Sequence, residues 1–131
     1  MFFNAYVDNI NRETTNEKGQ TEPIDLERGL ARIMCEKEIF MSLVSEFLVD
    51  LDYKYPQIIQ YFQNRDYQNL SELAHYIKGA AVNLAAEPMS AYAKELEMKA
   101  KSGDLEDGEV LVEHIKEEIE RMRKYVDVNF G

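Results

Sequence analysis

The stretch of sequence that decides the fold is Leu70 to Leu84, LSELAHYIKGAAVNL. At about 100° per residue, its apolar side chains fall on one broad stripe, as in a helix that packs one face on a core. The stripe consists of Leu70, Leu73, Ala74, Ile77, Ala80, Ala81 and Leu84. The sequence therefore predicts an amphipathic helix over about 67–84. Asp66 suits its N-cap, because a carboxylate there can accept a hydrogen bond from a free backbone N–H.

The opposite face of this predicted helix is mostly polar and carries a histidine in its middle. Its residues are Ser71, Glu72, His75, Lys78, Gly79 and Val82. A lone histidine is commonly a core side chain held by hydrogen bonds, but the position of His75 opposite the apolar stripe argues against that role. We therefore expect His75 to point to solvent.

Two neighbours distinguish His75 from an idle surface histidine. Gly79 lies one turn later, where glycine costs about 1 kcal/mol relative to alanine, so its presence indicates that another molecule approaches the backbone closely. Lys78 places a cation on the same face. Neutral imidazole is a good nucleophile at cellular pH, and an ammonium group can offset the charge of phosphoryl oxygens. Because the sequence has no phosphate loop, nucleotide-binding glycines or metal cage, a partner must complete such a site.

The segment from Leu73 to Leu84 closely resembles the signature of histidine-containing phosphotransfer (HPt) domains, in which His-x-x-Lys-Gly is followed by small residues. The resemblance covers about 24–126 and is strongest over 66–104. Further matching positions are Asp66, Leu70, Leu96-Glu97 and Lys101-Ser102-Gly103-Asp104. One departure is Ala85, because many members of the family have glycine after the Asn-Leu pair.

The resemblance implies a phosphocarrier with no kinase activity of its own, which shuttles a phosphoryl group between receiver-domain aspartates in a phosphorelay. Carried over to this chain, His75 is the phosphoacceptor, Lys78 the electrostatic support and Gly79 the clearance for the receiver's loop. The chain is expected to need no cofactor or metal of its own, because the receiver supplies Mg²⁺. Expected partners are response-regulator receiver domains or a hybrid sensor kinase.

Three further residues on the His75 face are candidates for docking the partner: Glu72, Val82 and Ser71. Val82 is an apolar side chain one to two turns beyond the histidine, where it can meet an apolar helix of a receiver. We expect Val82→Glu to slow transfer without unfolding the protein; a normal transfer rate in this variant would remove Val82 from the docking surface.

The rest of the chain predicts further helices. One short helix begins near Asp25 and points Leu26, Leu30 and Ile33 inward; the others span about 36–52, 56–64, 88–102 and 107–126. The 56–64 segment either stands alone or continues the preceding helix with a bend at Pro56. We expect an all-α protein, an antiparallel up-down-up-down four-helix bundle with a short extra N-terminal helix or arm. Residues 1–23 are predicted as an arm and polar linker, and 24–131 as the HPt-like bundle domain.

Composition limits the other possibilities. The 131 residues support one domain, and 15 Lys plus Arg against 25 Asp plus Glu give a net charge of −10. Such a chain repels nucleic acid and anionic lipid surfaces, and its lone Cys35 cannot close an intramolecular disulfide. We expect a cytoplasmic monomer that binds no nucleic acid and no membrane. The glutamates of the last helix, including Glu118, are predicted to form a solvated face.

Other functions fit the sequence less well than the phosphocarrier does. Glu72-x-x-His75 matches the ligand pattern of di-iron bundles, but that fold needs a second copy and inward-pointing ligands, and Leu111 stands three residues before His114. A non-catalytic helical adaptor, which binds a signalling partner without carrying phosphate, remains the main alternative. His114 is predicted to be a solvated flank residue without a function.

Overall fold

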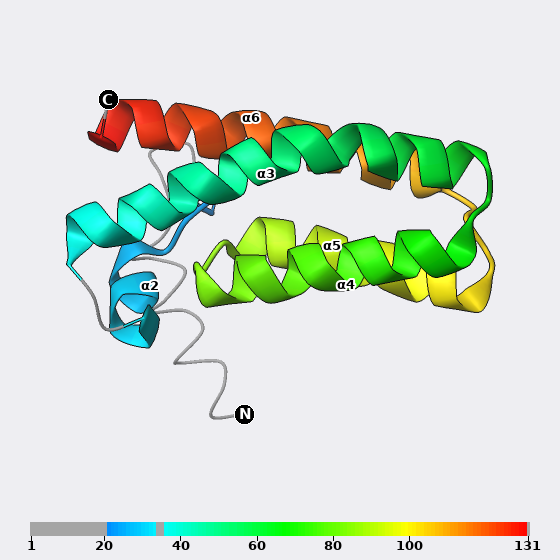
Figure 1. The fold of residues 1–131 in the computed structure, drawn as a ribbon, viewed down its shortest axis with the longest axis horizontal. Coiled ribbons are helices and arrows are strands. Elements are labelled where there is room, and N and C mark those ends of the chain that lie inside the picture. Colours follow the sequence, from blue (N-terminus) through cyan, green and yellow to red (C-terminus); the bar gives the residue numbers. More distant parts are fainter. Residues whose placement is uncertain (1–20, 34–35, 131) are drawn as a thin grey trace.

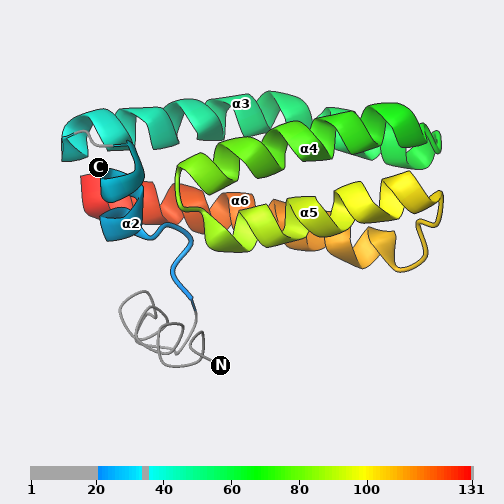
Figure 2. The same ribbon diagram turned by 90° about the horizontal axis from the view of Figure 1, so that it is seen from below.

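The structure, a computed structural model, describes residues 21–33 and 36–130. Within these ranges the chain forms five helices and no regular strand. They are α2 (Leu26–Ile33), α3 (Lys37–Gln63), α4 (Tyr67–Asn83), α5 (Glu87–Ser102) and α6 (Gly108–Phe130). The four long helices alternate in direction and lie side by side, while the short α2 packs at one end of the bundle (Figures 1 and 2). The predicted all-α four-helix bundle is confirmed. Most of the predicted N-terminal arm, 1–20, and Cys35 lie outside the described residues.

The helix ends follow local signals in the sequence. The Asp66 carboxylate caps α4 by accepting a hydrogen bond from the Asn69 backbone N–H at 3.2 Å. Asp25 accepts in the same way from the Arg28 N–H at the start of α2, at 3.1 Å. Gly103 ends α5 with a φ of 71°, in the left-handed region that glycine adopts at low cost. These three ends therefore lie close to where the sequence predicts them.

The predicted 36–52 and 56–64 helices form one continuous helix of 27 residues, α3, with Pro56 inside it. Proline removes its own backbone hydrogen bond and crowds the carbonyl one turn earlier, but Leu51 and Ile58, fully buried on either side of it, hold both halves against the same core. Packing therefore outweighs the local cost of Pro56. Similarly, α6 runs to Phe130 rather than to about 126, since neither glycine nor proline interrupts residues 127–130.

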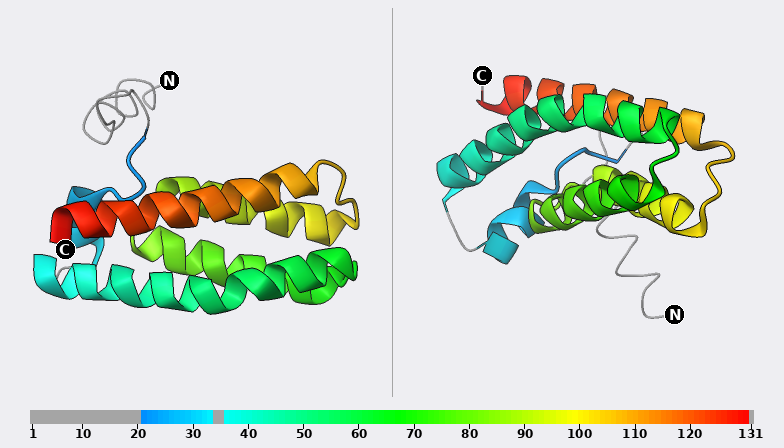
Figure 3. Two further views of the ribbon diagram at one scale, coloured as in Figure 1. Left: turned by 90° about the horizontal axis from the view of Figure 1, so that it is seen from above. Right: turned by 45° about the vertical axis from the view of Figure 1, so that its right-hand side comes forward.

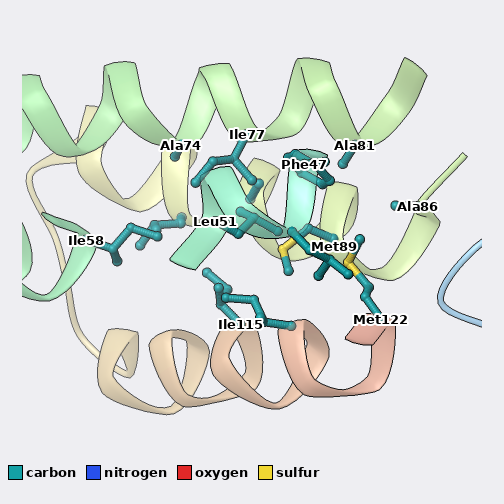
Figure 4. Packing of buried hydrophobic residues seen from close by; sticks show 14 of the residues in the cluster. Phe47, Leu51, Ile58, Ala74, Ile77, Ala81, Ala86, Met89, Ile115 and Met122 are labelled. Carbon is teal, nitrogen blue, oxygen red and sulfur yellow. The ribbon is translucent and has the colours of Figure 1, made fainter. Parts of the chain in front are cut away.

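The core lies between the four long helices, and Figure 4 shows side chains from all of them meeting there. The apolar stripe of α4 is buried as predicted, with Ala80 half-buried at its edge. Burial of each large apolar side chain contributes about 1.5–3 kcal/mol. Helices α4 and α5 form the most extensive helix pair in the described chain, and both carry buried alanines, small side chains that allow close packing. This close pairing places the side chains of α5 directly beside the exposed face of α4.

Ala85 lies in the short loop between α4 and α5, where it departs from the family pattern. Its φ is 53°, a left-handed conformation that glycine adopts more easily, and its side chain is fully buried. Its carbonyl accepts a hydrogen bond from the Asp25 N–H at 2.9 Å, which ties the start of α2 to this loop. Ala85 thus adopts a backbone conformation that glycine would adopt more easily, in a loop that lies outside the face carrying His75.

Candidate functional site

His75 lies at the middle of α4 on the outer face of the bundle. Its side chain is 67% exposed, whereas Ala74 and Ile77, on the inner face of the same helix, are buried. Helix α4 is flanked by α3 on one side and α5 on the other (Figure 3). Both neighbouring helices contribute polar side chains that contact residues of α4 near His75. The expected solvent-facing position of the histidine is confirmed.

The imidazole ring is held by a buried glutamate of α5. Nδ1 of His75 lies 2.9 Å from Oε2 of Glu97, a residue that is only 4% exposed. An ionised carboxylate can only accept hydrogen bonds, so Nδ1 must carry the ring hydrogen. In the neutral form of the ring, the other nitrogen, Nε2, then keeps the lone pair. Glu97 thus fixes both the orientation and the tautomer of an exposed histidine.

Two lysines complete the surroundings of Glu97. Lys78 of α4 places Nζ 2.9 Å from Oε1, and Lys101 of α5 places Nζ 2.9 Å from Oε2. Hydrogen bonds from Lys78 and Lys101, with a further one from His75, outweigh the effect of burial and lower the pKa of Glu97 to about 2. Glu97 is therefore ionised throughout the neutral range. We call these four residues, His75, Lys78, Glu97 and Lys101, the Glu97 cluster.

From the sequence alone, Glu97 and Lys101 have no predicted role beyond their place in the family match. A signal for Glu97 was nevertheless present, because it lies four residues after Ala93 and three before Ala100 on the buried stripe of α5. An acidic residue on a core-facing stripe needs partners to be stable there. Lys101, one turn later on the same side, is one of them, whereas Lys78 and His75 come from another helix.

On the α3 side of His75 lies a second group of polar residues, formed by Asp50 and Lys54 of α3 and Tyr76 of α4. The Tyr76 hydroxyl donates to Oδ2 of Asp50 at 3.0 Å, and Lys54 lies 3.0 Å from Oδ1 of the same carboxylate. The Lys54 ammonium also lies 4.8 Å from the centre of the Tyr76 ring, within the range of a cation–π contact. The hydrogen bond to Asp50 raises the pKa of Tyr76. The side chain of Tyr76, next to His75 in the sequence, is therefore held in place although it is exposed.

The remaining predicted site residues lie on the same face of α4. A Cβ added at Gly79 would meet nothing within 4 Å in the described structure, so packing gives no reason for glycine there. Val82 is exposed, and the Arg32 guanidinium of α2 donates to its backbone carbonyl. Glu72 is exposed and Ser71 half-buried. The structure thus brings the predicted residues onto one surface and adds Glu97 and Lys101 to them.

One prediction about the last helix is wrong. Glu118 is 2% exposed instead of solvated, and Oε1 accepts a hydrogen bond from Arg121 at 2.6 Å. It lies three residues after Ile115 and four before Met122, on the apolar stripe of α6, so helical geometry carries it inward. His114 is exposed as predicted, and its ring centroid lies 5.6 Å from that of Tyr92.

Neither a metal site nor a membrane span is found among the residues that the structure describes. They contain no group of three or more His, Cys, Asp or Glu side chains that could hold a metal ion. Glu72 and His75 both face outward, whereas a di-iron bundle needs inward-pointing ligands. None of the described helices is long and apolar enough to cross a membrane.

Comparisons with known proteins define the class to which this fold and histidine belong. The family model for the Hpt domain matches residues 42–125. The crystal structure of histidine-containing phosphotransfer protein B (HptB) from Pseudomonas aeruginosa PAO1 is similar in fold, with a TM-score of 0.73. The two chains are 27% identical, and the match covers 82% of this chain and 94% of that one. A search of curated proteins gave no significant match. The chain belongs to the Hpt domain family, because the family model spans more than half of it.

Membership in the family establishes the general role. Hpt proteins are phosphocarriers rather than conventional enzymes, and they take part in histidine phosphotransfer within phosphorelays, together with receiver domains or kinases. An exposed histidine on a packed helix of the bundle suits that general role.

Proposed function

We propose that this protein is a phosphorelay intermediate in which Nε2 of His75 accepts a phosphoryl group from the aspartyl phosphate of one receiver domain and passes it to another. One observation carries the proposal: the ring is exposed, yet its Nδ1 is fixed to the ionised carboxylate of Glu97 at 2.9 Å. This contact leaves the lone pair on the nitrogen that an approaching protein can reach.

The chemical step follows from this arrangement. The lone pair of Nε2 attacks the phosphorus atom, the bond from phosphorus to the aspartyl oxygen breaks, and the receiver's carboxylate leaves. Because Nδ1 keeps its hydrogen, the phosphorylated ring carries a positive charge, which the Glu97 carboxylate offsets. Transfer to the next receiver is the same step in reverse, onto a different aspartate. Glu97 is thus a positioning residue that acts through His75.

The charge of the phosphoryl group is shared between the two proteins. Lys78 lies on the His75 face with its ammonium group beside the ring, where it can offset the charge of the phosphoryl oxygens. Mg²⁺, which the receiver is expected to bring, supplies the remaining neutralisation when bound. This chain then contributes the nucleophile, its orientation and the ammonium groups, while the receiver contributes the aspartate and the metal.

The surface around His75 suits a protein partner. The open space above Gly79 supports its role as clearance for a receiver loop, because nothing in the described chain fills it. Val82 supplies an exposed apolar side chain further along the helix, and Glu72 and Ser71 lie on the opposite side of His75. These four residues form the proposed docking surface, with the histidine at its centre.

The test is phosphoryl transfer from several Mg²⁺-loaded, aspartyl-phosphorylated receiver domains, measured by intact mass. We expect an acid-labile phosphoryl adduct on the wild type and none on His75→Gln. The matched control is His114→Gln, which changes the other histidine of the chain, also exposed, and should be phosphorylated normally. An adduct that persists in His75→Gln would overturn the site. Binding of receivers without any adduct on the wild type would favour the non-catalytic adaptor.

A further inference from the structure

Lys101 shares one carboxylate oxygen with the imidazole ring. Its Nζ lies 2.9 Å from Oε2 of Glu97, and Nδ1 of His75 lies 2.9 Å from the same oxygen. Lys78 occupies the other oxygen, Oε1, also at 2.9 Å. Because ring and ammonium contact one atom, Lys101 lies immediately beside the histidine. The site therefore holds two ammonium groups, one on each side of the same carboxylate.

The charges in this cluster do not balance. Two ammonium groups face one carboxylate, which leaves an excess of one positive charge beside the ring. This excess occurs in a chain whose net charge is −10, so it is not a consequence of general composition. One lysine would satisfy the buried carboxylate together with the ring N–H. A second lysine points to an anion that arrives at the same place.

The two lysines differ in their freedom to move. The Lys78 side chain is 29% exposed, whereas that of Lys101 is 64% exposed and belongs to the last turn of α5. A lysine stem has four carbons and can redirect its ammonium group without any change in the backbone. Lys101 can therefore leave Glu97 at low cost, since Lys78 and His75 continue to hold the carboxylate.

We propose that Lys101 is a second ligand of the phosphoryl group, which exchanges Oε2 of Glu97 for the phosphoryl oxygens once Nε2 of His75 is phosphorylated. The proposal rests on the proposed function, because it requires a phosphoryl group on His75. In the unphosphorylated protein the ammonium group is kept beside the ring by Glu97. In the phosphorylated protein it contacts the dianion and makes the adduct more stable relative to free histidine.

The experiment follows the phosphorylated histidine by ³¹P nuclear magnetic resonance as the pH is varied. The full chain is phosphorylated with phosphoramidate, whose phosphorus–nitrogen bond breaks as Nε2 attacks, so that ammonia leaves. A cation next to the phosphoryl oxygens favours their dianionic form, so the titration midpoint of the ³¹P signal should rise by about 0.5 pH units in Lys101→Ala. Lys101→Arg keeps the charge and should restore most of the wild-type midpoint.

The matched control is Lys99→Ala, which removes the same charge from the same turn. Lys99 donates instead to the Glu106 carbonyl at 2.8 Å, so its loss should leave the midpoint unchanged. Equal midpoints in wild type and Lys101→Ala would overturn the role of Lys101 while leaving the phosphocarrier function intact. If the wild type shows no phosphohistidine signal with phosphoramidate or with receivers, the proposed function itself fails. Thermal melting of each variant checks that folding is preserved.

Discussion

Two glutamates in the described part of the chain are almost fully buried, and their pKa values are shifted in opposite directions. Glu97 on α5 is 4% exposed and Glu118 on α6 is 2% exposed. The pKa of Glu97 is lowered to about 2, whereas burial raises the pKa of Glu118. Burial alone predicts a raised pKa for both, because it penalises the charged form. The difference must therefore come from their partners.

The partners differ in number and in where they come from. Both oxygens of Glu97 accept hydrogen bonds, from two lysines and a histidine on two helices. Glu118 has Arg121 on one oxygen, while its other oxygen, Oε2, has no hydrogen-bond partner within the described chain. Arg121 also donates to the Thr21 carbonyl, so it is shared with the segment that precedes α2. The pKa is therefore lowered for the carboxylate with three charged or polar partners and raised for the one with a single partner.

This difference separates a functional position from a structural one. Glu97 lies directly beneath an exposed ring, and its charge is needed to hold that ring and to offset a positive charge on it. Glu118 instead pairs with Arg121 of the same helix, which also donates to the Thr21 carbonyl in the segment before α2. The two residues therefore predict opposite responses to the same substitution.

The largest expected effect on stability comes from removing the charge of Glu97 at pH 7, and Glu118 provides the comparison. Glu97→Gln should lower the free energy of unfolding by up to about 3 kcal/mol, the equivalent of its pKa shift. Glu118→Gln should leave the free energy of unfolding unchanged or raise it, because it removes a charge that burial disfavours. Urea denaturation of both variants measures the two values. Equal losses would show that the partner sets do not distinguish the two sites.

The pH dependence of stability sharpens the same comparison. The folded-state pKa of Glu97 is depressed, so its contribution is complete above its unfolded pKa and is lost as the pH falls from about 4.5 to about 2. The advantage of wild type over Glu97→Gln should therefore disappear over this range. For Glu118 the raised pKa reverses the sign, and any advantage of Glu118→Gln should be largest at neutral pH and vanish on acidification.

Denaturation series at pH 7, 5, 4 and 3 give both differences. The wild type is the reference at each pH, which cancels the titration of the other carboxylates. A gap between wild type and Glu97→Gln that stays constant down to pH 3 would contradict the assigned pKa. A gap for Glu118→Gln that widens on acidification would contradict the raised pKa of Glu118.

The sequence predicted much of this site, but not the contrast between the glutamates. The apolar stripe of α4 and the Asp66 cap are local signals, and they placed His75 on the outside correctly. Both glutamates lie on apolar stripes, so their burial was accessible from helical spacing. The partner of Glu118 stands three residues away and could also have been inferred.

The partners of Glu97 could not be inferred in that way. Lys78 and His75 precede it by 19 and 22 residues, on a different helix, and only the packing of α4 against α5 fixes their distances. The continuity of α3 through Pro56 depends in the same way on tertiary contacts, since Ile58 is fully buried beyond it. Sequence periodicity therefore identified the faces of the helices, while the pairing of charges across faces required the structure.

Two helical glycines, Gly29 and Gly79, differ in the same way in what surrounds them, one being closely packed and the other open. A Cβ added at Gly29 of α2 would lie 2.3 Å from the ring of Phe40, which is fully buried and cannot move freely. Gly29→Ala should therefore lower the free energy of unfolding by about 1–3 kcal/mol through overpacking. Thermal and urea denaturation measure this loss. A variant as stable as the wild type would mean that Phe40 can be displaced without cost.

Gly79→Ala should have the smallest effect on stability and the opposite sign. The added methyl group meets nothing within 4 Å in the described structure, and alanine is favoured over glycine in a helix interior by up to about 1 kcal/mol. The variant should therefore be slightly more stable than the wild type, yet accept a phosphoryl group from receivers more slowly. With phosphoramidate, which needs no close approach of a loop, His75 should still react at the wild-type rate. A variant that is more stable and equally fast with receivers would show that Gly79 is not the clearance for a partner. Slower reaction with both donors would instead place the effect of the methyl group on His75 itself.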